Sequence, residues 1–156
     1  QAVSATIKQG QQSLNEGYTQ TYSPGIRTNF KVAPNVSLDY RYSVTNNNQG
    51  SRETKFVTNA PSIEFDAYIW KKLTFRSNYT YTNQDLGNGE SQSFQNWDAT
   101  LSYRKDRDAK WEYEIKATNI LDIDSQVRNS ANNLSVFTSE TFIQPRFITF
   151  RFVYAL

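Results

Sequence analysis

The last eleven residues of the chain, Arg146 to Leu156, alternate between two kinds of side chain. Every second side chain is apolar or aromatic and the set between them is mixed, which is the pattern of an extended strand with two unlike faces. A tilted strand of about eleven residues can cross a bilayer. We therefore predict a strand here and expect its apolar side chains to face lipid; these are Ile148, Phe150, Phe152, Tyr154 and Leu156.

The same alternation recurs along the chain and predicts about eight strands, with no convincing helical periodicity. The clearest example in the first half runs from Val36 to Thr45. Pro61 is expected to mark a bulge or an irregular strand start, because proline cannot donate a ladder hydrogen bond. The other predicted strands lie at residues 3–8, 25–33, 54–70, 73–82, 97–104, 111–118 and 146–156.

Short and long connections alternate between the predicted strands. The short ones are Pro34-Asn35, Lys71-Lys72 and Lys105 to Lys110. The long and polar ones are Gln9 to Gln20, Asn46 to Glu53, Asn83 to Asn96 and Asp122 to Pro145. This asymmetry is typical of outer-membrane barrels, which have short periplasmic turns and long extracellular loops. The chain is therefore predicted to be all-β and to form an antiparallel transmembrane β-barrel, with about eight strands here.

The polar face of the predicted strands carries charges of both signs, whereas the apolar face carries almost none. Such charges are expected to pair across neighbouring strands over a wet barrel interior, usually as a solvated wall. The charges predicted to face the interior are Asp39, Arg41, Glu64, Asp66, Arg76, Asp98, Arg104, Glu112, Glu114, Lys116 and Arg151. Tyrosine and tryptophan residues near the strand ends would form an aromatic girdle at the lipid headgroups.

The composition agrees with a transmembrane barrel and argues against several other classes. A mean hydropathy of −0.72 with 15% aromatic residues suits strands of which only alternate residues meet lipid. No apolar run approaches the ~20 residues of a spanning helix, and no signal peptide is visible. The chain has no cysteine and no histidine, so we expect no disulfide, metal site, cofactor or catalytic residue. A net charge of +2 gives no reason to expect a nucleic acid partner.

Two short motifs near the C-terminus resemble those of TonB-dependent outer-membrane receptors. The stretch from Ala117 to Asp122 (ATNILD) is similar to an Asn-Leu-Leu-Asp signature, which Asn119, Leu121 and Asp122 match. The stretch from Phe142 to Arg146 (FIQPR) includes Gln144 and Pro145. With the strand that follows, it looks like the version in Bacteroidetes-type receptors that carry a carboxypeptidase-regulatory-like N-terminal domain.

The resemblance implies the C-terminal part of a 22-stranded barrel in the bacterial outer membrane, closed by a plug. Such a receptor imports a scarce nutrient, for example a glycan, a peptide or a metal chelate. The implied partners are outer-membrane lipid, the plug and the remaining strands, TonB, and a surface lipoprotein. The resemblance also implies that the alternation ending at Leu156 is read by the barrel-insertion machinery. Because the chain shows no plug and too few strands, residues 1–156 are interpreted as the C-terminal portion of such a receptor.

Two other interpretations stay open at this point. One is a complete eight-stranded outer-membrane barrel with a structural or adhesive role, since eight strands can close into a filled barrel. The other is a secreted soluble β domain that binds glycans, with Trp97 and Trp111 as stacking platforms. Enzymatic catalysis is not expected, because a Ser-His-Asp set needs histidine and the carboxylates are scattered among cations.

Overall fold

The computed structural model describes residues 2–8, 11–31, 34–49, 52–70, 72–86, 89–106, 108–131 and 136–154. All of their regular structure is β-strand, and no described segment is a helix that could span a membrane. The predicted all-β class is therefore confirmed. The strands are β1 (Ala2–Lys8), β2 (Gln11–Tyr22), β3 (Gly25–Arg27), β4 (Asn35–Gln49), β5 (Arg52–Ile69), β6 (Leu73–Asp85), β7 (Ser91–Arg104), β8 (Trp111–Thr118), β9 (Ser125–Ala131), β10 (Val136–Phe142) and β11 (Phe147–Tyr154).

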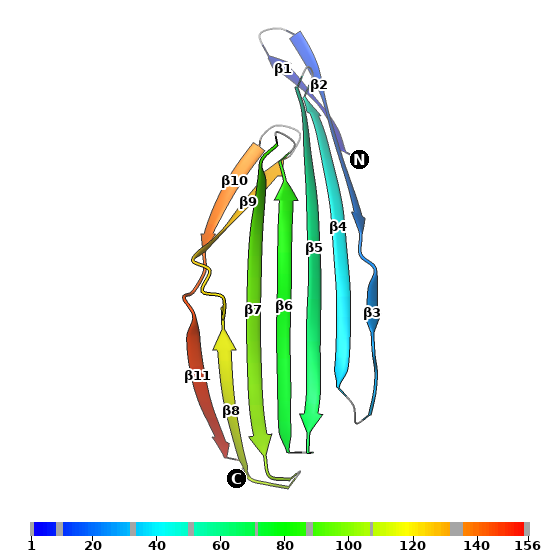
Figure 1. Cartoon of the computed structure of the whole chain (residues 1–156). Helices are drawn as coiled ribbons and strands as arrows, with labels where there is room; N and C mark the ends of the chain where they lie inside the picture. The colour runs from blue at the N-terminus through cyan, green and yellow to red at the C-terminus, as the bar shows by residue number, and fades with distance from the viewer. Residues whose placement is uncertain are drawn as a thin grey trace.

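Nine of the strands form one antiparallel sheet, and β9 and β10 form a separate hairpin. Figure 1 shows the sheet as a single layer in which the strands from β4 to β8 lie side by side in chain order. The full order is β1, β2, β4, β5, β6, β7, β8 and β11, and β3 also pairs with β4. Because β1 and β11 occupy the two edges and no pairing within the described residues joins them, the described sheet is open.

The sheet has no conventional hydrophobic core. Among the described side chains, the buried hydrophobic ones are Phe56, Ala60 and Ala67, and no large side chain is fully buried. A soluble two-layer domain hides one face of its sheet under the second layer. Here the backbone hydrogen bonds between strands hold the described sheet together, and both faces of the layer are open to their surroundings.

Three of the predicted long loops are largely strand, so their prediction was wrong. Residues Gln11 to Gln20 belong to β2, and β4 and β5 pair as far as Gln49 and Arg52. In the loop predicted from Asn83 to Asn96, β6 continues to Asp85 and β7 begins at Ser91; residues 87 and 88 between them lie outside the described residues. The side chains of these three segments are mostly Asn, Gln, Ser and Thr, so their hydropathy does not alternate in a way that would reveal a strand. Their backbone groups nevertheless form ladder hydrogen bonds as well as those of apolar residues do.

The predicted loop from Asp122 to Pro145 contains the β9–β10 hairpin, which is a further correction. Figure 1 shows this hairpin beyond the ends of β8 and β11, beside the upper part of β7. We use "upper" for this end of the sheet and "lower" for the end with the turns after β5 and β7. Both lower turns lie where they were predicted, between β5 and β6 and between β7 and β8, although Lys71 and Arg107 are outside the described residues.

The connection after β3 differs from the prediction at both ends. β3 ends at Arg27, earlier than the predicted strand, of which Val32 and Ala33 lie outside the described residues. Asn35 is the first residue of β4 and not part of a tight turn. Its side chain accepts a hydrogen bond from the Phe30 amide at 2.6 Å and donates one to the Phe30 carbonyl at 3.2 Å. The side chain of Asn35 thus closes the connection.

Pro61 lies in the middle of β5 and causes no bulge, contrary to the prediction. Asn59 pairs with Asn83 and Ser62 with Thr80, so the register is the same on both sides and no residue is inserted. Pro24, between β2 and β3, also interrupts the pairing with β4 without shifting it, because β2 and β3 share one register against β4. Each proline removes an N–H donor without shifting the pattern of faces.

Gly25 lies directly under the carboxylate of its cross-strand partner Asp39. A Cβ atom at this position would collide with Asp39 Oδ1 and approach Asp39 Cγ to 3.3 Å. We expect Gly25→Ala to lower the free energy of unfolding by less than about 1 kcal/mol, because the colliding atom is the end of the exposed Asp39 side chain, which can rotate away. Urea unfolding should show this loss, and it should shrink when Asp39→Ala is also present. An equal loss with and without the Asp39 carboxylate would contradict this explanation.

Candidate functional site

The register between strands brings the apolar residues of six strands onto one face, which we call the apolar face. One row of paired residues on it runs Val36, Phe65, Ser77, Ala99, Ala117 and Ile148. The apolar face comprises Val36, Leu38, Tyr40, Tyr42 and Val44 of β4; Pro61, Ile63, Phe65, Ala67 and Ile69 of β5; Leu73, Phe75, Ser77, Tyr79 and Tyr81 of β6; Trp97, Ala99, Leu101 and Tyr103 of β7; Trp111, Tyr113, Ile115 and Ala117 of β8; and Ile148, Phe150, Phe152 and Tyr154 of β11.

No described element covers the apolar face. Ile148 is 73% exposed and Phe150 is 64% exposed, and most of the other large side chains on this face are exposed as well. Soluble monomers rarely expose a continuous apolar patch larger than a few hundred Å². This face therefore requires an apolar environment or a partner. Leu156, predicted to belong to it, lies outside the described residues.

Aromatic rings cluster at the lower end of the apolar face. The ring centroid of Trp111 lies 4.3 Å from that of Tyr154 and 4.7 Å from that of Phe152, and Tyr113 lies 5.2 Å from Phe152. At the upper end, Tyr79 donates a hydrogen bond to Gln95 and Trp97 donates one to Ser77. The rings thus combine apolar contact area with satisfied polar groups.

Amide side chains mark the upper limit of the apolar face, a feature that the sequence interpretation missed. On each strand from β4 to β7, the first strongly polar residue above the apolar set has an amide side chain. Asn119 above β8 and Arg146 above β11 occupy the equivalent positions. The four strand amides are Asn46, Asn59, Asn83 and Gln95. The detectable signal was the first Asn or Gln that interrupts the apolar alternation of each strand. Four or five apolar positions per strand lie below this limit, and we call this zone the apolar band.

The upper limit of the apolar band crosses the hydrogen-bonded rows obliquely. Asn59 pairs with Tyr42, so the limit on β5 is four residues lower than at Asn46 on β4. Asn83 pairs with Asn59, and the limit therefore stays level between β5 and β6. Gln95, the limit on β7, pairs with Tyr81, two residues below Asn83.

The same descent continues to the far edge of the sheet. Asn119 follows the Ala99–Ala117 pair by two residues, which places it level with Trp97 and two residues below Gln95. Arg146 is level with Asn119 when the β8–β11 register is extended by one residue. From β4 to β11 the upper limit therefore descends by about eight residues in five strand steps. At ~3.3 Å per residue and ~4.8 Å between strands, this slope corresponds to roughly 45°.

The lower limit of the apolar band slopes in the same direction. Val36, the lowest apolar residue of β4, pairs with Phe65, four residues short of Ile69 at the end of β5. Trp111 and Tyr154 form a row two residues beyond the one that contains Ile69. The lower limit thus descends by about six residues over the same five steps, or roughly 40°. The two limits are nearly parallel, and the band keeps a nearly constant width.

The opposite side of the sheet, which we call the charged face, holds the charges identified in the sequence. Arg76 binds Asp66 and Arg151 binds Glu114, each at 3.1 Å between directly paired residues. Arg27 reaches Glu64 at 3.3 Å across the small side chain of Ser37. Exposed pairs of this kind contribute only about 0–1 kcal/mol each. Their effect is to match opposite charges along this face.

The other charges of this face have different partners. Asp98 accepts hydrogen bonds from the Asn119 amide at 2.9 Å and the Asn96 side chain at 3.2 Å. Arg104 donates to the carbonyl of Ala109, and Asp39 accepts from Ser37. In the register, Glu112 pairs with Arg104 and Lys116 with Thr100. The predicted cross-strand ion pairs therefore form for some of these charges, and hydrogen bonds hold others.

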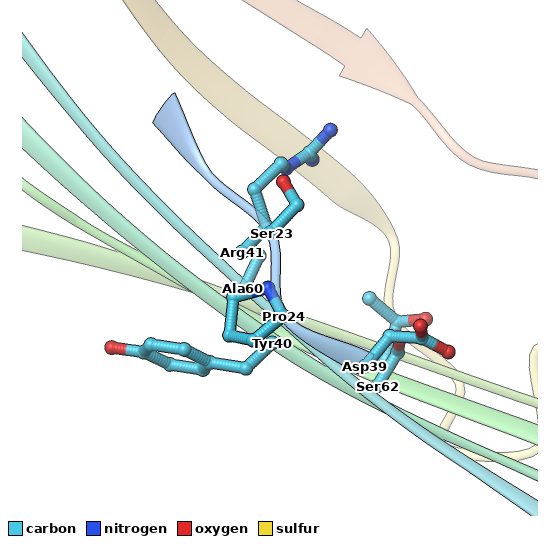
Figure 2. Close-up of a pocket in the computed structure, with 8 residues that line it drawn as sticks. Ser23, Pro24, Asp39, Tyr40, Arg41, Ala60 and Ser62 are labelled. Carbon is cyan, nitrogen blue, oxygen red and sulfur yellow. The ribbon is translucent and has the colours of Figure 1, made fainter. Parts of the chain in front are cut away.

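A small hollow lies on the charged face where Pro24 separates β2 from β3. Its lining consists of Ser23, Pro24, Asp39, Tyr40, Arg41, Ala60, Ser62 and Thr80. Figure 2 shows Arg41 and Ser23 on one side, Asp39 and Ser62 on the other, and the Tyr40 ring pointing away from both. Among the described residues, no three acidic, histidine or cysteine side chains gather as a metal site would require. The hollow offers hydrogen-bonding groups and no recognisable catalytic set.

The two sequence motifs near the C-terminus meet at Asn119. This residue is 4% exposed and adopts a left-handed backbone conformation with a φ of 49°. Its side chain donates to the carbonyls of Ile123 at 2.9 Å and Gln144 at 3.0 Å, and accepts from the Ile123 amide at 3.0 Å. Asn119 thereby links the chain that leaves β8 to the chain that enters β11.

Asp122 and Arg146 make the second connection between the motifs. The Arg146 amide donates to Asp122 Oδ1 at 3.1 Å, and the Arg146 guanidinium lies 3.6 Å from Asp122 Oδ2. Leu121 and Pro145 are exposed beside them. We call the group of Asn119, Asp122, Gln144 and Arg146 the polar node. Its contacts close the base of the β9–β10 hairpin.

The residues identified from the sequence thus fall into three places: the apolar band, the charged face and the polar node. The apolar sets and the charges occupy opposite faces, because paired strands keep alternate side chains on the same side.

Neither a protein-family model, nor a curated protein, nor a solved structure matches the chain.

Proposed function

We propose that the chain is part of a transmembrane β-barrel in a bacterial outer membrane. More specifically, we propose that it is the C-terminal part of a TonB-dependent transporter that imports a nutrient. The observation that carries the membrane assignment is the apolar band, which is uncovered, bounded at both ends and oblique to the strands. The transporter assignment rests on the two motifs that form the polar node.

The slope of the apolar band supports a barrel because strands in a closed barrel tilt by about 35–45° from its axis. A membrane is perpendicular to that axis, so its boundaries must cross the rows of a tilted sheet at the same angle. The observed limits slope by roughly 40–45°. The band spans about nine residues along β5, from Pro61 to Ile69, or roughly 30 Å of strand. With that tilt its height is roughly 20–25 Å, close to the apolar zone of outer-membrane barrels.

The open sheet favours a segment of a larger barrel over a complete eight-stranded one. In lipid, an unpaired strand edge leaves backbone N–H and C=O groups without partners, at several kcal/mol each. The edges formed by β1 and β11 therefore need further strands. The uncovered apolar face also counts against a soluble glycan-binding domain. In that alternative Trp97 and Trp111 would stand within a wide apolar surface that water would have to solvate.

The transporter proposal assigns the charged face to the barrel interior. There the partly matched charges would face water and a plug domain, with which the remaining groups can form charge-assisted hydrogen bonds. TonB and a surface lipoprotein are the further partners proposed. With no histidine in the chain and no catalytic set on the described faces, transport fits the charged face better than catalysis does.

Membrane fractionation of cells that express the intact gene tests the membrane assignment. We expect the protein in the outer membrane, resistant to carbonate extraction and dependent on detergent for solubility. Recovery as a soluble periplasmic or secreted protein would overturn it. The gene tests the transporter assignment: we expect a plug and further strands to be encoded before Gln1. A 156-residue chain that refolds alone into a closed barrel would replace the transporter with a small barrel.

A further inference from the structure

We infer that the lower rim of the apolar band binds the phosphate groups of anionic phospholipids. The lower rim consists of Trp70, Lys72, Lys105, Lys110, Trp111 and Tyr154, which lie in or beside the two lower turns. The inference rests on the membrane assignment proposed above and adds to it a particular lipid class. It is carried by three exposed lysines in two turns that hydrogen bonds tie together, one of which, Lys110, lies over the ring of Tyr154.

Hydrogen bonds tie the two lower turns together. The Arg104 amide donates to the Lys72 carbonyl at 2.8 Å, which joins the end of β7 to the turn between β5 and β6. The Arg104 guanidinium donates to the Ala109 carbonyl at 3.3 and 3.2 Å, one residue before Lys110. The backbone positions of the lysines are therefore set by a connected structure and not by separate loose loops.

Lys110 shows how an ammonium group sits at the edge of the band. Its Nζ atom lies 5.8 Å from the centroid of the Tyr154 ring, within the range of a cation–π interaction. Tyr154 in turn packs against Trp111, which belongs to the lowest row of the apolar band. If these rings lie at the membrane interface, the Lys110 ammonium lies at the level of the lipid headgroups. Trp70, 86% exposed in the neighbouring turn, adds a second interfacial ring.

The positive charge is concentrated at this end of the described sheet. The lower connections carry Lys31, Lys72, Arg104, Lys105 and Lys110 against Asp106 and Asp108. At the upper ends of β5 and β6, the acidic residues Glu53, Asp85 and Glu90 accompany the two cations Arg52 and Lys55. None of the three rim lysines forms an ion pair with a described residue, whereas Arg27, Arg76, Arg146 and Arg151 do. The ammonium groups of the rim lysines are therefore not occupied by ion pairs with described residues and can bind an external anion.

A phospholipid with a net negative charge fits the lower rim better than a zwitterionic one. A lysine near an anionic membrane surface gains roughly a fivefold increase in affinity, the equivalent of about 1 kcal/mol. Three lysines provide the positive charge, and the rings and the apolar band provide a surface for acyl chains. At the upper limit the amides carry no charge and Arg146 is paired with Asp122, so the preference should belong to the lower rim.

The test measures lipid binding to the intact, detergent-purified protein by native mass spectrometry. The two lipids are phosphatidylglycerol and phosphatidylcholine with the same acyl chains. We expect the wild type to bind phosphatidylglycerol at least fivefold more tightly. Lys72→Gln, Lys105→Gln and Lys110→Gln together should remove this preference. Replacing the same three residues with arginine should preserve it, and Lys55→Gln, an exposed lysine near the other end, should not change it.

Equal affinity of the wild type for the two lipids, or a preference that survives the triple glutamine substitution, would overturn the inference. Binding of neither lipid by a protein that is soluble without detergent would instead overturn the membrane assignment itself. The electrophoretic mobility of the unheated protein shows whether each variant is folded. The substituted side chains are exposed, three of them at the lower turns and Lys55 in β5, so the variants should fold like the wild type.

Discussion

Phe150→Arg should prevent most of the protein from reaching its folded form in the outer membrane. Phe150 lies in the middle of the apolar band on β11, pairs with Ile115 and is 64% exposed. On the proposed lipid-facing surface, an arginine near the midplane costs roughly 2–4 kcal/mol, which exceeds the effect of most surface substitutions. The amount of heat-modifiable, folded protein in outer-membrane fractions measures the loss.

Thr149→Arg is the matched control for this variant. Thr149 precedes Phe150 in the same strand but projects from the charged face, where it pairs with Lys116. An arginine there adds a like charge next to lysine in an exposed position and should cost no more than about 1 kcal/mol. Assembly should therefore stay close to that of the wild type. If both variants assembled equally well, the assignment of the apolar face to lipid would be wrong.

Asn119→Gly should destabilise the polar node by about 2–3 kcal/mol. The substitution keeps a residue that tolerates the left-handed φ of 49° but removes the three side-chain hydrogen bonds. Each bond contributes roughly 1 kcal/mol, and buried groups without partners add to the loss. Asn119→Ala should cost about 1 kcal/mol more, because alanine is strained in this backbone conformation.

Limited proteolysis measures this effect where it should appear. The β9–β10 hairpin is joined to the sheet near the polar node, so it should become the first site of cleavage in both Asn119 variants. Asn78→Ala serves as the control, because Asn78 is exposed on β6 and pairs within the regular ladder. Unchanged cleavage of the hairpin in Asn119→Gly would show that the node does not hold its base.

The strands that the sequence predicted well are those in which one face is strictly apolar. From Val36 to Thr45 and from Trp111 to Thr118 the alternation is unbroken, and the structure has strands there. The segment from Gln11 to Gln20 has no such contrast between faces, so its strand was not recognised. Its pairing depends on a neighbouring strand that supplies hydrogen bonds, and this information is absent from local hydropathy.

The polar node shows a second limit of the sequence. Its two motifs could be recognised individually, but Asn119 also bonds through its backbone to Asp98, 21 residues earlier in the chain. That contact follows from the register of β7 and β8, which a single sequence does not provide. The charges were assigned to a common face correctly because alternation needs only local information. Their individual partners, such as Ser37 for Asp39, depend on the three-dimensional arrangement of the side chains.

The oblique course of the apolar band has a consequence for tolerance to substitution. In the row from Val36 to Ile148, the first residue is at the lower limit of the band and the last is the uppermost apolar residue of its strand. Ser77, near the middle of that row, accepts a hydrogen bond from the Trp97 indole. If the band spans a bilayer, residues joined by backbone hydrogen bonds therefore differ in depth. Tolerance to a polar substitution should then depend on the depth of the residue in the bilayer: it should be lowest near the centre of a row and higher at the two ends of the row. The position of a residue within its strand would not be enough to predict this tolerance.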